Sequence, residues 1–274
     1  MKSVEHATRE IKEFKVQGAN QIALYGLSFL RKTALRSGFG REFNATSRRL
    51  EQARPTAVVL HNCIQIIKAN PSISTIDSLT EDLKTVGKRE SIYSDQIIGH
   101  RSKIITYCHS GEAMSFIKHA RITHRKRISV IACKTEPLGQ GISTARELAK
   151  DGIPITLVDD NAIGFFIGHA DIAVVGADAI RKEGIVNKVG TSLLAQAAAG
   201  ASKPFYVIAN SLKIDRRTKF SIEERPPREL KVPKGIPRGI TIRNPAFDIT
   251  PWRHVTGVIN EDGIFSGRQF VKLL

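Results

Sequence analysis

The sequence predicts an α/β protein in which a helical N-terminal domain is followed by a Rossmann-like domain with a mainly parallel sheet. Two observations predict this fold. The first hundred residues have no strand-like apolar run, and their apolar residues recur mostly every three to four positions, as at Leu24, Leu27 and Leu30. From Ser102 onward, short β-branched runs alternate with helical patterns, as they do in parallel βαβ units.

The predicted strands are short and continuously apolar. They cover residues 103 to 107, 128 to 132, 153 to 158, 171 to 178 and 204 to 210, and the predicted helices between them cover 112 to 121, 143 to 152, 162 to 168 and 186 to 200. Such strands, separated by single helices, are typical of a parallel sheet buried on both faces. We therefore place the helical domain at residues 1–98 and the Rossmann-like domain at 99–274, with a long, charged and Pro-rich excursion from 216 to 243.

Positive charge dominates the composition. The 274 residues include 42 Lys and Arg against 26 Asp and Glu, a formal charge of +16. This balance predicts attraction to polyanions or to phosphorylated small molecules. Only 6% of residues are aromatic, and no nucleic-acid-binding motif accompanies the charge, so nucleic acid is a possible partner without motif support. No apolar run reaches the roughly 18 residues of a membrane span and the start is charged, so we expect a cytoplasmic protein without membrane contact.

The cysteines and glycines argue against bound cofactors. Cys63, Cys108 and Cys133 form neither an even disulfide set nor a Cys-x-x-Cys metal pair, so we expect free thiols and no metal site. No strand-to-helix turn carries Gly-x-Gly-x-x-Gly or a P-loop, which disfavours a dinucleotide or P-loop nucleotide. We expect no cofactor.

Two candidate catalytic residues follow predicted strands. In an open α/β sheet the ligand crevice lies at the carboxyl ends of the strands. Cys108 follows the strand at 103 to 107 and precedes a helix, whose dipole is expected to lower the pKa of the thiol. Asp178 closes the strand at 171 to 178, where it would act as a general acid or base. The structural alternatives are a buried small hydrophobe for Cys108 and a turn cap for Asp178.

Three further polar residues are expected at the same edge of the sheet. Asn187 and Lys188 are predicted to open the helix at 186 to 200, where free backbone N–H groups and a lysine would cradle a phosphate. Lys213 follows the strand at 204 to 210. Each of these residues could equally be an ordinary solvated side chain.

Several long motifs resemble one protein family. They are QGISTARELAKDGIPITLVDDNA at 140 to 162, VVGADAIRKEGIVNKVGTSLLAQAA at 174 to 198, IRNPAFDITP at 242 to 251, and ARPTAVVLHN at 53 to 62. They resemble the family that unites the regulatory alpha, beta and delta subunits of translation initiation factor 2B with two sugar-phosphate isomerases. These enzymes act on 5-methylthioribose 1-phosphate and on ribose 1,5-bisphosphate, and the resemblance covers nearly the whole chain.

The resemblance assigns roles to the two candidates. In the isomerases a strand-end cysteine is thought to act as the base at sugar C2, and the aspartate of a Gly-Ala-Asp motif as the acid that helps to open the ring. Cys108 and Asp178 match these positions, although Tyr107 stands where the isomerases have His. Regulatory members tend to lack the cysteine. The resemblance therefore implies an enzyme.

The motifs that indicate the substrate resemble both isomerase types. The Cys108-His109-Ser110 run resembles the bisphosphate enzymes, and Lys213 matches a substrate-binding lysine of that type. SIEERPPREL, at 221 to 230, looks instead like the methylthioribose enzymes. Ribose 1,5-bisphosphate is the favoured substrate.

The chain departs from the isomerase pattern at two expected phosphate contacts. The phosphate loop Arg-Gly-Ala-Gly appears as Gln17-Gly18-Ala19-Asn20, and Thr-Arg-Pro appears with Glu136 in place of the arginine. Each lost charge-assisted bond removes about 1.5 to 3 kcal/mol. Arg54 remains.

The sequence thus predicts an aldose-ketose isomerase that converts ribose 1,5-bisphosphate to ribulose 1,5-bisphosphate. The alternatives are a non-catalytic regulatory or nucleotide-sensing protein like initiation factor 2B, and a methylthioribose-1-phosphate isomerase. The expected partners are a phosphorylated sugar and further copies of the chain, in a dimer or a hexamer as the resemblance implies.

Overall fold

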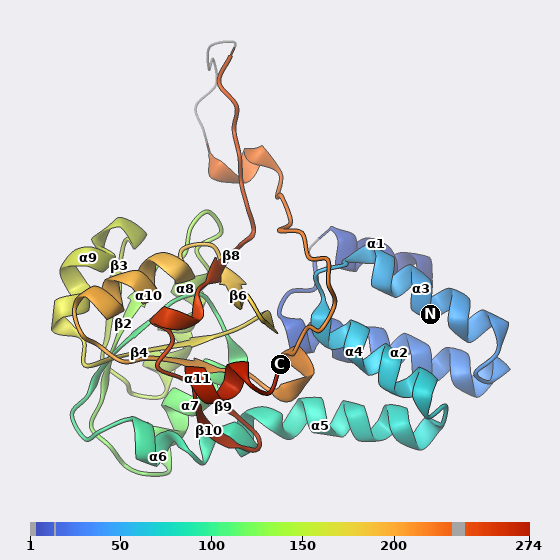
Figure 1. Cartoon of the computed structure of the whole chain (residues 1–274), viewed down its shortest axis with the longest axis horizontal. Helices are drawn as coiled ribbons and strands as arrows, with labels where there is room; N and C mark the ends of the chain where they lie inside the picture. The colour runs from blue at the N-terminus through green and yellow to red at the C-terminus, as the bar shows by residue number, and fades with distance from the viewer. Residues whose placement is uncertain (1–3, 14, 232–238) are drawn as a thin grey trace.

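The computed structural model describes residues 4–13, 15–231 and 239–274. Its first part is helical, as predicted. The helices are α1 (Val4–Lys12), α2 (Ala19–Ser37), α3 (Arg41–Ala53), α4 (Val58–Ala69), α5 (Ile73–Ser91) and the short α6 (Ser94–Ile97). In Figure 1, α1 to α4 form a separate layer beside the α/β part, and α5 runs from that layer to the underside of the sheet.

Periodic apolar side chains hold the helical part together. Leu27, Leu30, Leu50 and Ile64 are all buried in one cluster that joins α2, α3 and α4. Each helix contributes residues spaced by three or four, so one face of every helix is removed from water. The sequence pattern predicted this packing.

The second part is built on a seven-stranded sheet. Its strands are β1 (Lys103–Thr106), β2 (Ser129–Cys133), β3 (Ile155–Val158), β4 (Ile172–Gly176), β7 (Phe205–Ile208), β9 (Gly257–Asn260) and β10 (Gly263–Ser266), in the order β10-β9-β7-β4-β1-β2-β3. All neighbours pair in parallel except β9 and β10. The mainly parallel sheet is therefore confirmed.

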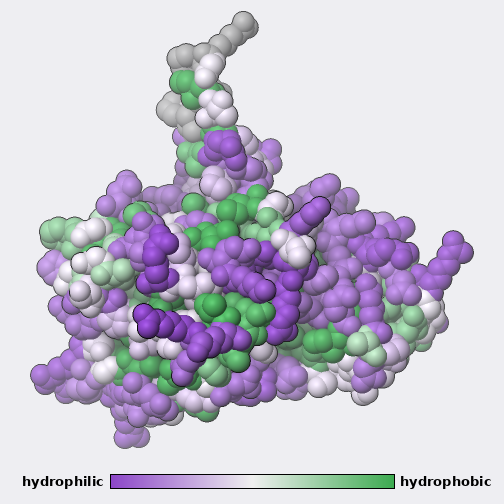
Figure 2. Space-filling model, in the orientation of Figure 1, coloured by the Kyte–Doolittle hydropathy of each residue, from purple (hydrophilic) through white to green (hydrophobic). Residues whose placement is uncertain are grey.

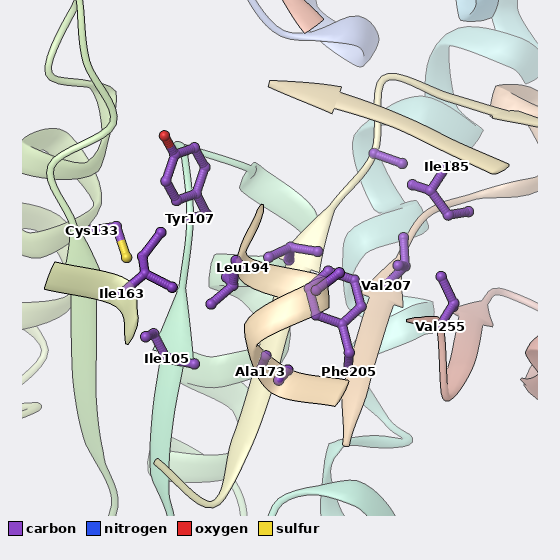
Figure 3. Packing of buried hydrophobic residues seen from close by; sticks show 14 of the residues in the cluster. Ile105, Tyr107, Cys133, Ile163, Ala173, Ile185, Leu194, Phe205, Val207 and Val255 are labelled. Carbon is purple, nitrogen blue, oxygen red and sulfur yellow. The ribbon is translucent and has the colours of Figure 1, made fainter. Parts of the chain in front are cut away.

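Helices cover both faces of this sheet. They are α7 (Gly111–Ile122), α8 (Gln140–Lys150), α9 (Ile163–Phe166), α10 (Thr191–Gly200) and α11 (Gly267–Val271). Neighbouring strand residues point to opposite clusters: Ile104 packs with α7, whereas Ile105 packs with Leu194 of α10. Figure 3 shows this second cluster, in which the Cys133 side chain lies beside Ile163. Both faces of the strand are dry, which explains its continuous apolar sequence.

One predicted helix is wrong in its first half. Residues 186 to 188 belong to β6 (Gly184–Lys188), which lies between β5 (Ala179–Arg181) and β8 (Phe247–Thr250) in a small antiparallel sheet, and the helix begins only at Thr191. β6 pairs with β8, which lies about sixty residues further along the chain, so no local sequence pattern indicates this pairing. Residues 162 to 168, predicted as one helix, form α9 flanked by the 3-10 turns η1 (Asp160–Ala162) and η2 (Ile167–His169).

The segment after β7 includes the predicted excursion. The 3-10 turn η3 (Ser211–Lys213) precedes the excursion predicted at 216 to 243, η4 (Pro227–Leu230) lies within it, and η5 (Trp252–His254) follows β8. Figure 1 shows the chain around η4 reaching away from the body of the molecule. Part of the predicted excursion, 232 to 238, lies outside the described residues. The domain division at residue 98 stays a prediction, since α5 packs along α7 through a hydrogen bond between Ser91 and Ser115. No helix within the described ranges is long and apolar enough to cross a membrane.

Candidate active site

The strand order reverses between β1 and β4. The chain passes from β1 outward to β2 and β3, and then returns to the other side of β1 at β4. A crevice at the carboxyl ends of two such strands is the usual ligand site of an open α/β sheet. Cys108 lies just beyond β1 and Asp178 just beyond β4, so the structure brings both predicted residues to this point.

The backbone at Cys108 is held in an unusual conformation. Its φ of 67° lies in the left-handed region, which non-glycine residues rarely adopt. Two threonines fix it there: the Cys108 N–H donates to Thr135 Oγ1 at 2.9 Å, and Thr144 Oγ1 donates to the Cys108 carbonyl at 2.8 Å. Strain of this kind concentrates at functional sites.

Burial controls the Cys108 thiol. Burial and the nearby Asp178 charge raise the pKa of Cys108, the His109 backbone N–H and Lys188 lower it, and the result is about 12. The predicted lowering of the Cys108 pKa by the following helix is therefore wrong. The loss of hydration outweighs the positive end of the helix, because a half-buried thiolate surrounded by protein loses part of its solvation.

Asp178 responds to the same surroundings. Burial and the charge of Glu223 raise the pKa of Asp178, the charges of Arg54 and Lys188 lower it, and the result is about 6. The Asp178 N–H donates to the carbonyl of Val186 at 2.9 Å, which ties the residue to β6. Its carboxylate thus lies within electrostatic range of a thiol, a lysine and an arginine.

Asn187 and Lys188 reach the site from β6 and not from a helix. Asn187 Nδ2 donates to Thr191 Oγ1 at 3.1 Å, so its amide is engaged in the fold. The first turn of α10 is also occupied, since the N–H groups of Gly190 and Ser192 donate to Asp248 at 2.7 Å and 3.1 Å. The predicted phosphate cradle at the start of this helix is therefore wrong: a carboxylate of the same chain already fills it.

Lys188 is nevertheless a central cation of the crevice. It is buried, and burial lowers its pKa, while the charges of Cys108, Asp178 and Glu229 raise it and that of Arg225 lowers it. Arg225 forms a two-bonded pair with Glu229, at 2.6 Å and 2.8 Å. The sequence analysis did not select these last two residues; the only signal was the charge of the Pro-rich segment that contains them.

Arg54 enters the site from the helical part. It caps the end of α3, and its Nε donates to Glu223 Oε2 at 3.2 Å. The Glu223 carboxylate also accepts from Thr56 Oγ1 at 3.0 Å. Arg54 also lies over the ring of Phe247, and its charge lowers the pKa of Asp178. The helical part and the excursion therefore both line the crevice.

His109 and Ser110 lie between β1 and α7. His109 is exposed, and its Nδ1 is 3.0 Å from Thr144 Oγ1; burial of part of its ring lowers its pKa. Ser110 caps α7 by accepting from the Ala113 N–H at 3.4 Å. A Cβ at Gly176 would lie 2.1 Å from Ser110 Oγ, so this glycine lets the start of α7 approach the end of β4.

The stretch from Gln17 to Asn20 spans the start of α2, whose first residues are Ala19 and Asn20. Gly18 is the N-cap residue, with φ 85°, and no side chain caps the helix. Gln140 Nε2 donates to Gln17 Oε1 at 3.2 Å, and Asn20 Nδ2 donates to Glu112 Oε1 at 3.4 Å. These contacts hold the stretch against the first turns of α8 and α7, beside the crevice.

Lys213 is not free at this edge of the sheet. It is buried and forms an ion pair with Glu112, whose Oε1 also accepts from Asn210 Nδ2 at 2.5 Å. Burial lowers the pKa of Lys213 to about 8. The sequence analysis missed Glu112, the carboxylate that joins Lys213 to Asn20.

Glu136 is compensated by its neighbour. It forms an ion pair with Lys134, and its N–H donates to Asp160 Oδ2 at 2.7 Å. Asp160 also accepts from the Thr135 N–H at 2.8 Å, which fixes the threonine that holds Cys108. Within the ranges that the structure describes, no three His, Cys, Asp or Glu side chains gather as a metal site would require.

The match with known proteins extends over almost the entire chain. Residues 15–267 match the model of the initiation factor 2 subunit family. The chain belongs to this family. It is 34% identical to the ribose 1,5-bisphosphate isomerase of Archaeoglobus fulgidus, over 96% of this chain and 90% of that protein. It is 31% identical to a methylthioribose-1-phosphate isomerase of Desulfitobacterium hafniense, over 98% of this chain and 89% of that protein.

A solved structure from the same family is also similar. The translation initiation factor eIF-2B of Pyrococcus horikoshii superposes with a TM-score of 0.84 and 29% identity, covering 98% of both chains. The family thus includes members named as enzymes and members named as translation factors. Because enzymes and translation factors share this fold, the residues of the site must distinguish between the two functions.

Proposed function

We propose that this member of the initiation factor 2 subunit family is a sugar-phosphate isomerase. It converts an aldose phosphorylated at C1 into the ketose, and its substrate is ribose 1,5-bisphosphate, with ribulose 1,5-bisphosphate as product. The relatives named as isomerases support the class of reaction. The observation that carries the proposal is the meeting of Cys108 and Asp178 at the switch point between β1 and β4.

The proposed reaction needs one base and one acid. The phosphate on O1 blocks simple ring opening, so proton removal at C2 must be coordinated with cleavage of the bond between C1 and the ring oxygen. Cys108, as thiolate, takes the C2 proton, while Asp178 gives a proton to the ring oxygen. The enol then collapses: the Cys108 thiol returns its proton to C1, and Asp178 accepts the proton of the C2 hydroxyl. Both residues finish as they began.

The resting protonation states require an internal proton transfer that runs uphill, from the group with the higher pKa to the group with the lower one. With pKa values of about 12 for Cys108 and about 6 for Asp178, the neutral-pH pair is a thiol beside a carboxylate. Moving one proton from sulfur to oxygen creates the thiolate base and the carboxylic acid together. Lys188, which lowers the pKa of Cys108, stabilises the thiolate.

Several cations are proposed to hold the phosphates. Lys188 and Arg54 are near the reacting pair, and the free backbone N–H groups at the start of α2 lie beside Gly18, Ala19 and Asn20. Helix N-termini favour anions. These groups would compensate for the arginines that Gln17 and Glu136 replace. Asn187, His109 and Ser110 are proposed to position the sugar.

Methylthioribose 1-phosphate is the second candidate substrate. The observation that favours it is the ion pair between Lys213 and Glu112. If Lys213 stays paired, the enzyme has one cation fewer for a second phosphate, and a substrate with a single phosphate becomes the better fit. Ribose 1,5-bisphosphate therefore requires that this pair opens or that another cation binds the C5 phosphate.

A regulatory protein without turnover is the alternative from another class. It is favoured by the replacement of two expected arginines and by the similarity to the structure titled eIF-2B. A protein of this kind would bind the phosphorylated ligand in the same crevice. It would not need the thiol.

One assay separates these functions. Purified protein is given ribose 1,5-bisphosphate or methylthioribose 1-phosphate, and the ketose product is measured. We expect Cys108→Ala and Asp178→Asn each to reduce kcat at least about 100-fold, the usual contribution of an acid or base. Cys63→Ala, at a buried thiol in the helical part, serves as the matched control and should keep its turnover.

Each outcome decides between the alternatives. Absence of turnover with both sugars, together with measurable binding, would favour the regulatory protein. Turnover of methylthioribose 1-phosphate alone would replace the substrate. Turnover that survives the Cys108 change would overturn the mechanism and leave the class of reaction intact.

The resemblance also supports two statements about the whole protein. We propose that it works in the cytoplasm and that its copies associate as a dimer or a hexamer. Sedimentation of the purified protein tests the second statement.

A further inference from the structure

The sheet has a second functional edge, opposite the crevice. At the amino ends of the parallel strands, the residues just before β1 and β2 are strongly basic. Five cations lie there and define what we name the basic edge: Arg101, Lys103, Arg121, Arg125 and Arg127. Lys150 before β3 and Lys203 before β7 extend the basic edge on its two sides.

The cations of the basic edge are not neutralised by the fold. Among the described residues, none of the seven side chains forms an ion pair. The three nearby carboxylates are all engaged elsewhere. Asp95 pairs with Lys126, Asp151 pairs with Lys118, and Asp171 accepts from the backbone N–H of Lys103. Asp171 keeps its negative charge and offsets part of the positive charge beside Lys103, but the cations at the starts of β1 and β2 outnumber it.

Two of these arginines have a strained backbone conformation. Arg101 and Arg125 have φ values of 64° and 50°, in the left-handed region. The two basic loops are joined by a hydrogen bond of 2.6 Å from the Arg101 N–H to the Arg127 carbonyl. Lys126 anchors the second loop by donating to the carbonyls of Asp95 and Ile98. Arg101, Arg125 and Arg127 are all left exposed on a fixed frame.

The spacing of the basic edge fits one phosphate backbone. Neighbouring strands lie about 4.8 Å apart, so the starts of the five strands from β3 to β7 form a row roughly 19 Å long. Cations lie at the starts of β3, β2, β1 and β7, and Asp171 precedes β4. Arginine forks bind phosphate oxygens in pairs. The cations lie in short loops and in the last turns of α7 and α8, which end at this edge and do not extend past it as a helix that enters a duplex groove would. Figure 2 shows hydrophilic residues crowding the lower left of the molecule, where α6 lies beside this edge in Figure 1.

We propose that the basic edge binds the backbone of a single-stranded nucleic acid. Binding is electrostatic and tolerant of sequence, because the basic stretches 99–103 and 121–127 contain no Phe, Tyr or Trp on which bases could stack. This site is independent of the isomerase crevice, since the two lie at opposite ends of the same strands. It also accounts for positive charge that one phosphosugar site does not need.

Fluorescence anisotropy of a labelled RNA oligonucleotide of mixed sequence tests the proposal. Measurements from about 50 to 200 mM salt should give a linear fall of log affinity against log salt. Arg125→Glu with Arg127→Glu should weaken binding at least tenfold and make the salt slope shallower by about 1.4, at about 0.7 for each lost phosphate contact. Arg125→Gln with Arg127→Gln should give a smaller loss of the same kind.

The matched control removes the same charge elsewhere. Arg41→Glu with Arg48→Glu changes two exposed arginines of α3 and should leave the slope unchanged. Isomerase turnover should persist in both pairs of variants. An equal loss in both pairs, tighter binding of duplex than of single strands, or binding of anionic vesicles without RNA would each overturn the proposal. The same measurement with a DNA oligonucleotide of the same sequence shows whether the ribose 2′-hydroxyl contributes to binding. Equal affinity for RNA and DNA supports recognition of the phosphate backbone.

Discussion

At the scale of single residues, the positions of Cys108 and Asp178 depend on the order of the strands, whereas their pKa values depend on the surrounding side chains. Their common place at the edge of the sheet followed from the order of strands, and the structure confirms it. Their pKa values did not follow from sequence. Desolvation depends on every neighbouring segment, and here it makes the thiol harder to ionise than a strand-end position suggests.

The two pKa values predict a pH profile for the proposed isomerase. The proposed mechanism needs Cys108 and Asp178 to carry one proton between them. This singly protonated form predominates between pH values of about 6 and about 12. We expect kcat/KM to rise tenfold per pH unit below about 6 and to stay level from about 7 to 9. A pH series at low substrate concentration measures this. A rate that instead climbs steadily above pH 7 would mean that Cys108 ionises without giving its proton to Asp178.

At the scale of elements, the best predictions concern the central strands. Five apolar runs were assigned correctly. Four of them form strands that are largely buried on both faces, which leaves a continuous local signal. The fifth forms the edge strand β3, in which Thr156 and Leu157 are exposed. Residues 186 to 188 were assigned wrongly, because Val186, Asn187 and Lys188 read as the first turn of the helix that follows. Pairing with β8, and for Val186 also with Ala179 of β5, makes them a strand. The strands β9 and β10 near the C-terminus were not predicted at all.

The contact between α8 and β2 gives a test at this scale. A Cβ added at Gly141 would lie 1.7 Å from the Cys133 carbonyl oxygen, so α8 touches the end of β2 through backbone alone. We expect Gly141→Ala to lower the free energy of unfolding by about 2 kcal/mol or more, since the backbone must shift. Urea unfolding measures the loss. Gly164→Ala, where a Cβ meets nothing within 4 Å, is the control and should change stability little.

At the scale of the whole molecule, buried charges join the helical part to the sheet. Glu112 of α7 contacts Lys213 and Asn20, which come from distant segments. Glu90 of α5 is fully buried nearby, and neither carboxylate oxygen has a hydrogen-bond partner among the described residues. Burial raises the pKa of Glu90 to about 8, against a smaller lowering by Lys213.

Glu90 therefore makes stability depend on pH. Its folded-state pKa lies above its unfolded value, so its contribution is fully present below pH 4 or so and is lost as pH rises toward about 8. Glu90→Gln keeps the shape and removes this loss. We expect the variant to gain about 1 to 3 kcal/mol over the natural protein at pH 8 and little at pH 4. Urea unfolding at both pH values decides; a gain independent of pH would contradict a buried neutral carboxyl.

The sequence by itself determined the alternation of strands and helices, the helical first part and the residues that gather at the carboxyl ends of β1 and β4. These are local signals, since apolar periodicity and strand order are written along the chain. Tertiary structure alone decided the rest: the high pKa of Cys108, the capture of Lys213 by Glu112 and the occupation of the α10 N-terminus by Asp248. Each depends on desolvation or on partners far away in the sequence, which no local pattern records.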